Sequence, residues 1–231
     1  MIKERRLSDE LSKTGITDLA TEYAEVGLDQ LLDNGLLREL PGLKTIIGAI
    51  RACRSARDYV FFKKIKRFVE SIEEYPAEQR QEFARTMDED PEYRARVTDS
   101  LLLLLEQLDD IEKAVLLARA FTAFVRGDVE SFYYFQRYGE IIKAANVTHL
   151  RNLYQTTEED GDLDNPRNFV SDQVLPLLSL GLVELGEPES AFRQQTARRG
   201  ITCFIITEFG AKFIRTVIMK GDIKSEEQSG E

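Results

Sequence analysis

The chain has 231 residues, of which 42% are hydrophobic and 31% charged, and its 41 acidic against 31 basic side chains give a formal net charge of −10. This composition predicts a folded protein rather than a disordered one, and apolar runs such as Leu101–Leu105 are far shorter than the roughly 20 residues that cross a bilayer. Two widely spaced cysteines make no disulfide framework and residues 1–10 lead into no apolar signal-peptide core, so we expect a cytoplasmic protein.

Helical periodicity covers the N-terminal part of the chain. Residues 8–40 have leucines and other apolar side chains at helical spacing, with breaks at Gly27 and Asn34-Gly35. The segment 44–69 follows Pro41-Gly42 and predicts a basic amphipathic helix or helix pair, because its apolar side chains share one face and its basic side chains the other.

The charge of this segment is unusual in an acidic protein. Residues 41–69 carry eight basic side chains and one acidic, whereas residues 70–130 carry seven basic and sixteen acidic. One interpretation is an anionic-surface site, for a membrane or a nucleic acid. Its candidate residues are Arg51, Arg54, Arg57, Lys63, Lys64, Lys66 and Arg67. The other interpretation is that the neighbouring acidic helices neutralise these charges inside the protein.

Capping residues divide the rest of the N-terminal part into short helices. Pro91 is predicted to open one helix, and Asp109 or Asp110 to cap the next, over 111–125, which Gly127 ends. The following helix has an apolar stripe formed by Phe132, Phe135, Tyr138 and Ile142. These elements predict a helical domain over 1–139.

The C-terminal part combines helices with two strands. The predicted elements are a supporting helix over 140–153, an acidic loop over 156–167, a helix over 169–180, strands over 181–185 and 201–207, a helix over 208–219, and a disordered tail over 221–231. Gly181 allows a left-handed turn, Thr207 can cap the last helix, and Gly210 lets that helix approach the sheet.

The order of these elements resembles the end of a winged-helix domain. The resemblance is carried by Leu180-Gly181-Leu182-Val183-Glu184 and by Ile205-Ile206-Thr207-Glu208-Phe209-Gly210-Ala211-Lys212-Phe213. It implies a winged-helix-like α+β domain over 140–220 with a small antiparallel sheet. The N-terminal portion is similar to bacterial proteins of unassigned function, and this similarity implies no mechanism.

The resemblance implies a DNA-binding alternative, because winged helices commonly place one helix in the major groove and the wing on the backbone. Carried onto this chain, the helix candidates are Arg167, Asn168 and Gln173, and the wing candidates are Arg193, Arg198 and Arg199. Residues 140–220 hold nine basic and eleven acidic side chains, and Pro176 interrupts the would-be recognition helix. A protein partner or self-association therefore suits the charge balance as well as DNA does.

Catalytic and metal-binding patterns find little support. His149 is the sole histidine, and Cys53 and Cys203 are most simply buried small hydrophobes. The acidic run Asp160–Asp164 does not continue as a calcium loop, because Asn165 stands where such a loop needs glycine and Ser171 where it needs glutamate. We expect no catalytic site, no metal and no cofactor.

The sequence therefore predicts a mainly α protein, with a helical array followed by the winged-helix-like module. Its predicted function is that of a non-enzymatic binding or regulatory protein that uses this module to recognise a protein partner. The alternatives are a DNA-binding transcriptional regulator and a peripheral membrane-associated protein that acts through helix 44–69.

Overall fold

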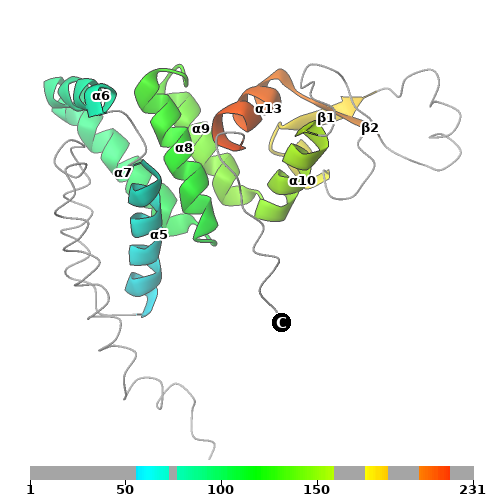
Figure 1. Cartoon of the computed structure of the whole chain (residues 1–231), viewed down its shortest axis with the longest axis horizontal. Coiled ribbons are helices and arrows are strands. Elements are labelled where there is room, and N and C mark those ends of the chain that lie inside the picture. Colours follow the sequence, from blue (N-terminus) through cyan, green and yellow to red (C-terminus); the bar gives the residue numbers. More distant parts are fainter. Residues whose placement is uncertain (1–55, 73–76, 159–174, 187–202, 219–231) are drawn as a thin grey trace, which may run out of the picture. The chain divides into compact units, whose positions relative to one another are not determined.

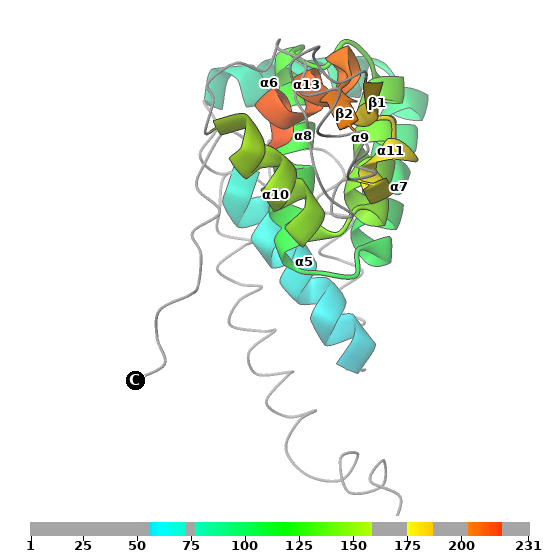
Figure 2. The same ribbon diagram turned by 90° about the vertical axis from the view of Figure 1, so that its right-hand side faces the viewer.

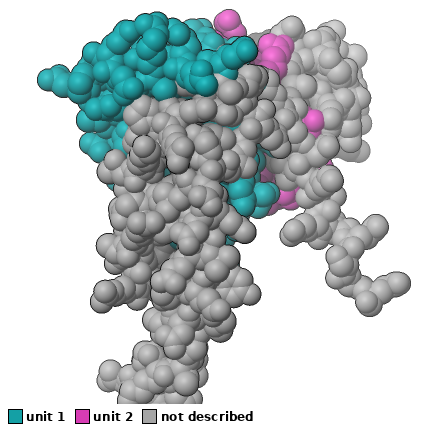
Figure 3. Space-filling model, turned by 60° about the vertical axis from the view of Figure 1, so that its left-hand side comes forward, with its two compact units in different colours: residues 1–132 teal, residues 133–231 magenta. Residues whose placement is uncertain are grey.

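The computed structural model describes residues 56–72, 77–158, 175–186 and 203–218 (Figure 1). These residues are mainly helical and include one two-stranded antiparallel sheet, so the predicted fold class is confirmed. The chain forms two compact units, unit 1 over residues 1–132 and unit 2 over residues 133–231 (Figure 3). The sequence pattern placed the division after residue 139, whereas the units divide seven residues earlier, after Phe132.

The described part of unit 1 is built from helices. They are α5 (Ala56–Ile72), α6 (Ala77–Glu89), α7 (Pro91–Gln107) and α8 (Glu112–Arg126). The helix predicted over 44–69 is described from Ala56 onward and continues to Ile72, and the helices predicted over 8–40 lie outside the described residues. α5 lies along α8, its main packing partner (Figure 1 and Figure 2).

An aromatic cluster forms the core between these helices. The ring of Phe121 on α8 lies 5.8 Å from the rings of both Phe68 and Phe83, and Phe83 also meets Phe124 edge-on. Such tilted and edge-to-face pairs add to the stabilisation that burial of the ring surface supplies. The core thus joins α5, α6 and α8.

The start of α7 and the end of α8 follow the sequence rules. Asp90 precedes Pro91 and its Oδ1 accepts a hydrogen bond from the Tyr93 amide at 2.9 Å, which caps α7. The prediction that Asp109 or Asp110 caps the next helix is wrong, because Ile111 is the N-cap residue of α8 and makes no side-chain capping bond. Asp110 lies just before it, and its Oδ1 accepts from the Glu112 amide at 2.9 Å. Gly127 ends α8 with φ of 80°, the left-handed conformation that glycine favours.

The described part of unit 2 contains two strands, at the predicted places, and further helices, the first of which begins at Phe132. The elements are α9 (Phe132–Ala144), α10 (Val147–Glu158), α11 (Leu175–Leu178), β1 (Val183–Gly186), β2 (Cys203–Ile206), α13 (Glu208–Phe213) and a π-helical turn, η1 (Ile214–Ile218). The prediction of one supporting helix over 140–153 is wrong, because the chain breaks between α9 and α10. Asn146 produces the break, since its Oδ1 accepts from the Thr148 amide at 2.8 Å. Most of the predicted loop over 156–167 and the predicted tail over 221–231 lie outside the described residues.

The predicted antiparallel ribbon is confirmed. β1 pairs with β2, Val183 opposite Ile206 and Leu185 opposite Phe204. Val183, the first residue of β1, is buried. Tyr138 of α9 is also buried, and its ring centroid lies 5.6 Å from that of Phe209 and 5.1 Å from that of Phe213.

Thr207 joins the ribbon to the last helix. Its hydroxyl donates to the Gly181 carbonyl at 2.7 Å and accepts from the Gly210 amide at 2.9 Å, while its own amide donates to the Leu182 carbonyl. Gly181 has φ of 72°, and Gly210 lies directly against the Leu182 carbonyl. The sequence predictions for Gly181, Thr207 and Gly210 are therefore confirmed. We call Gly181, Leu182, Thr207 and Gly210 the Thr207 joint.

We predict that Gly210→Ala lowers the free energy of unfolding by about 2 kcal/mol, because a methyl group at residue 210 would overlap the Leu182 backbone. Urea unfolding followed by circular dichroism measures this. Gly127→Ala is the control, since a methyl there meets no atom within 4 Å and costs only the strain of positive φ, about 1 kcal/mol. A Gly210→Ala protein at least as stable as Gly127→Ala would contradict the close packing at residue 210.

Candidate functional site

The basic side chains predicted to form an anionic-surface site do not share one exposed face. Lys63 and Arg67 are exposed on α5, and Lys66 is half-buried. Lys64 is buried, with 6% of its surface exposed, so its assignment to an exposed binding face is corrected. Three candidates cannot be placed in this way: Arg51 and Arg54 lie outside the described residues, and the side chain of Arg57 is not described.

Lys64 is buried because its ammonium group hydrogen-bonds to backbone carbonyls at the C-terminal end of α7. Its Nζ donates to the carbonyl of Glu106 at 3.1 Å and to the carbonyl of Leu108. The last carbonyls of α7 have no partners within the helix, and they lie at the negative end of its dipole. Helical periodicity put Lys64 on the polar side of α5, but its ammonium group reaches these carbonyls instead of solvent.

A second lysine reaches the same turn between α7 and α8. Lys113 has only 2% of its side chain exposed, and its Nζ lies 2.6 Å from Oδ1 of Asp109, whose side chain is 75% exposed. The hydrogen bond from Lys113 lowers the pKa of Asp109, and the charges of Lys113 and Lys64 lower it further. Lysines from α5 and α8 thus hold the α7–α8 turn.

Two of the remaining basic residues of α5 form ion pairs with acidic neighbours. Lys66 lies 3.8 Å from Glu70, and Arg67 lies 3.7 Å from Glu112 at the start of α8. Exposed pairs of this kind contribute little stability, but they offset charge. Together with Lys64 and its carbonyl partners, they support internal neutralisation as the role of this helix.

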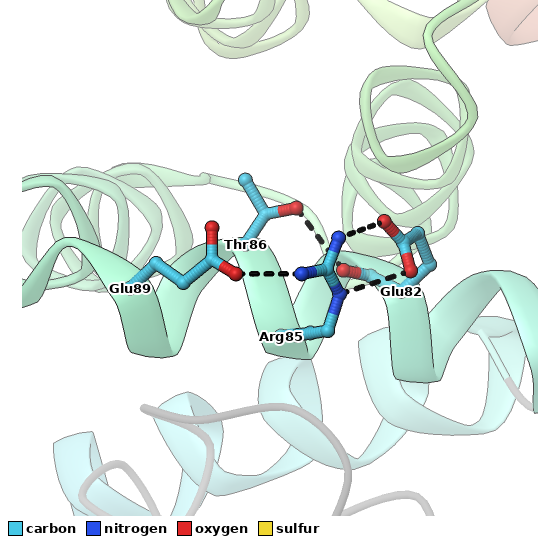
Figure 4. A network of polar contacts seen from close by, with 4 residues as sticks. All are labelled: Glu82, Arg85, Thr86 and Glu89. Atoms are coloured by element: carbon cyan, nitrogen blue, oxygen red, sulfur yellow. Dashed lines mark hydrogen bonds and ion pairs between the residues drawn. The ribbon is translucent and has the colours of Figure 1, made fainter.

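The acidic surface of α6 carries a network of its own (Figure 4). The guanidinium of Arg85 lies between Glu82 and Glu89, with nitrogen–oxygen distances of 2.7 and 2.6 Å. The hydrogen bond from Arg85 lowers the pKa of Glu82. Because all three side chains are exposed and spaced as helix neighbours, the network is a solvated surface feature.

The nucleic-acid candidates lie in parts of the chain that the structure does not describe. They are Arg167, Asn168 and Gln173, which precede α11, and Arg193, Arg198 and Arg199, between β1 and β2. The structure describes the two strands that flank the wing candidates. β1 ends and β2 begins at register partners, Gly186 and Cys203.

Large apolar side chains are exposed on unit 2. Tyr133 on α9 is 65% exposed, Leu175 on α11 is 52% exposed, and Leu185 on β1 is 64% exposed. Sequence reasoning missed them because it followed the buried stripe of each element. For Tyr133 a signal was present, since it lies off the stripe formed by Phe135, Tyr138 and Ile142.

An arginine and an aromatic ring meet on the same unit. The guanidinium carbon of Arg137, on α9, lies 3.9 Å from the ring centroid of Phe209, on α13. A nitrogen of this guanidinium is also 3.4 Å from where a Cβ on Gly181 would stand. The stack holds the guanidinium where α9, α13 and the turn after α11 meet.

His149, the one imidazole in the sequence, is half-buried on α10. Its Nδ1 and the Nε of Arg151 are buried atoms without a hydrogen-bond partner among the described residues. Across the described ranges, no three His, Cys, Asp or Glu side chains are grouped so that they could hold a metal ion.

None of the helices described here combines the length and the apolar character needed to cross a membrane. Comparisons of this chain with family models, with curated proteins and with solved structures found no match. Function is therefore inferred from the geometry of the described residues.

We predict that Lys64→Met lowers the free energy of unfolding by about 2 kcal/mol, because the apolar stem remains while the carbonyls of Glu106 and Leu108 lose a charged donor. Chemical denaturation measures the change. Lys63→Met, at the neighbouring exposed position, is expected to shift stability by less than about 0.5 kcal/mol. Equal or higher stability for Lys64→Met would mean that burying the ammonium costs more than its hydrogen bonds return.

Asp109 gives a pH-dependent prediction. Its folded pKa is lowered, so the stability it contributes is present above the ordinary carboxyl pKa, about 4, and is lost as the pH falls through the lowered folded value. We expect Asp109→Asn to be less stable than the parent chain at pH 6–7, by under about 1 kcal/mol because the carboxylate is exposed. Urea midpoints measured from pH 7 to pH 3 should converge at the acidic end. A difference that stays constant over this range would contradict the Lys113–Asp109 pair.

Proposed function

We propose that this chain is a non-enzymatic binding protein that recognises a protein partner through unit 2, and that unit 2 is a winged-helix module. The order of elements supports the module: α9, α10 and α11 precede the ribbon, and α13 follows it. The Thr207 joint supports it further, because it fixes the ribbon to the last helix at the position where the sequence resemblance lies.

The exposed leucine on the ribbon carries the proposal of a protein partner. Leu185 is 64% exposed although Phe204, its register partner, is buried, and Glu184 beside it is exposed as well. An apolar side chain next to a carboxylate suits a protein surface and not a phosphate backbone.

The charge of the module agrees with this choice. The described residues of unit 2 include five lysines and arginines against four aspartates and glutamates. A DNA-binding face concentrates positive charge, usually in clear excess. The nearly balanced charge of these residues supports recognition by shape and apolar contact.

Photo-crosslinking from the ribbon tests the proposal. We expect a chain with p-benzoylphenylalanine in place of Leu185, expressed in its own cells, to form a protein adduct of one defined mass on irradiation. An adduct of twice the chain mass would identify self-association. The matched control carries the same group in place of Leu103 of α7, which is 54% exposed in unit 1 and should give no such adduct.

Two outcomes would contradict the proposal. One is an adduct from residue 185 that nuclease removes, which would favour the DNA-binding alternative. The other is the same pattern of adducts from residues 185 and 103, which would show that the ribbon contacts proteins no more specifically than the surface of α7 does.

A further inference from the structure

The Arg137 side chain is held in a fixed orientation on the surface of unit 2. Its guanidinium carbon lies 3.9 Å from the centroid of the Phe209 ring, and the ring of Phe209 is itself supported by the buried Tyr138. Gly181 leaves room for one guanidinium nitrogen. A guanidinium stacked in this way loses little rotamer freedom when it binds a ligand.

The donors of this guanidinium are available to a ligand. Arg137 is exposed, and no ion pair or hydrogen bond joins its guanidinium to another of the described residues. Lys143 on the same helix differs, because it pairs with Glu140. A planar guanidinium with free N–H groups matches a carboxylate, which it can bind through two parallel hydrogen bonds.

An exposed aromatic residue lies one helical turn before Arg137. Tyr133 is 65% exposed, and its ring meets that of Tyr134 edge-on, with centroids 5.5 Å apart. Tyrosine and arginine are among the residue types that most often dominate protein interfaces. Residues four apart on a helix share a face, so Tyr133 and Arg137 are presented together.

We propose that Tyr133, Arg137 and Phe209 form a docking surface for a peptide segment of a partner protein, in which an aspartate or glutamate stands near an apolar residue. The carboxylate would bind Arg137 and the apolar residue would lie on Tyr133. This Arg137 surface rests on the proposed function and adds the chemistry of the partner.

The charge around the Arg137 surface favours a single carboxylate over a polyphosphate chain. Glu208 precedes Phe209 and is exposed, and Glu140 lies three residues after Arg137 on α9. These carboxylates disfavour a run of phosphates, whereas one carboxylate can be held at the guanidinium alone.

Peptide selection tests the inference, because the protein itself then chooses the sequences that it binds. The probe is a phage-displayed library of random twelve-residue peptides, selected on the full chain. We expect the selected peptides to be enriched in aspartate and glutamate over the unselected library. In fluorescence anisotropy they should bind Arg137→Ala at least tenfold more weakly, and Arg137→Lys at least fivefold more weakly, because lysine keeps the charge without the stacked planar fork.

Arg96→Ala provides the matched control. Arg96 is also exposed and lies over an aromatic ring, with its guanidinium carbon 5.8 Å from the centroid of Tyr93 in unit 1. Its loss removes the same charge, so peptide affinity should stay within twofold of the parent. Circular dichroism establishes whether each variant is folded. If Arg137→Ala does not fold, the peptide affinity of Arg137→Lys tests the inference.

Selected peptides without acidic enrichment, or equal affinities for the Arg137 and Arg96 variants, would overturn the inference. The proposed function would survive that result if residue 185 still crosslinked to a protein. Failure of both experiments would remove the protein-binding function itself.

Discussion

The hydroxyl of Thr207 makes the contact on which unit 2 depends. It donates to the Gly181 carbonyl and accepts from the Gly210 amide, so one side chain links the turn after α11 to the first turn of α13. The two glycines permit this arrangement, one through its positive φ and the other through its close approach to Leu182. Leu185 lies on β1 and Phe209, the ring under Arg137, lies on α13, so the joint holds together the ribbon and the helix that contribute to the candidate recognition surfaces.

In unit 1, buried lysine side chains stabilise the fold. Lys64 and Lys113 are buried at the α7–α8 turn, where backbone carbonyls and Asp109 are their partners. Ammonium groups at the end of α7 complement its dipole. The basic helix that is conspicuous in the sequence therefore serves in part to hold the fold of unit 1, and the recognition surfaces that we propose are on unit 2.

Local rules explain which features could be predicted from the sequence. Asp90, Gly127 and Thr207 act within one turn of the chain, and all three behave as capping rules require. The burial of Lys64 could not be predicted, because it depends on how α5 approaches the end of α7. The Arg137–Phe209 stack likewise needs α9 and α13, far apart in sequence, to pack together. The break at Asn146 has a local cause, the hydrogen bond from the Thr148 amide to its Oδ1. It was not predicted, because the apolar pattern continues through this residue.

Native-state hydrogen exchange of Thr207→Val tests most directly whether the ribbon and α13 form one unit around this hydroxyl. Valine has nearly the shape of threonine and replaces its hydroxyl with a methyl group, which can neither donate nor accept a hydrogen bond. We expect the amides of residue 207, of Gly210 and of the β1–β2 ladder to exchange with a common opening free energy in the parent chain. All should exchange faster in the variant, by about tenfold for the loss of roughly 1.4 kcal/mol of hydrogen bonding. Ribbon amides that keep their parent rate, while those of α13 alone speed up, would contradict it.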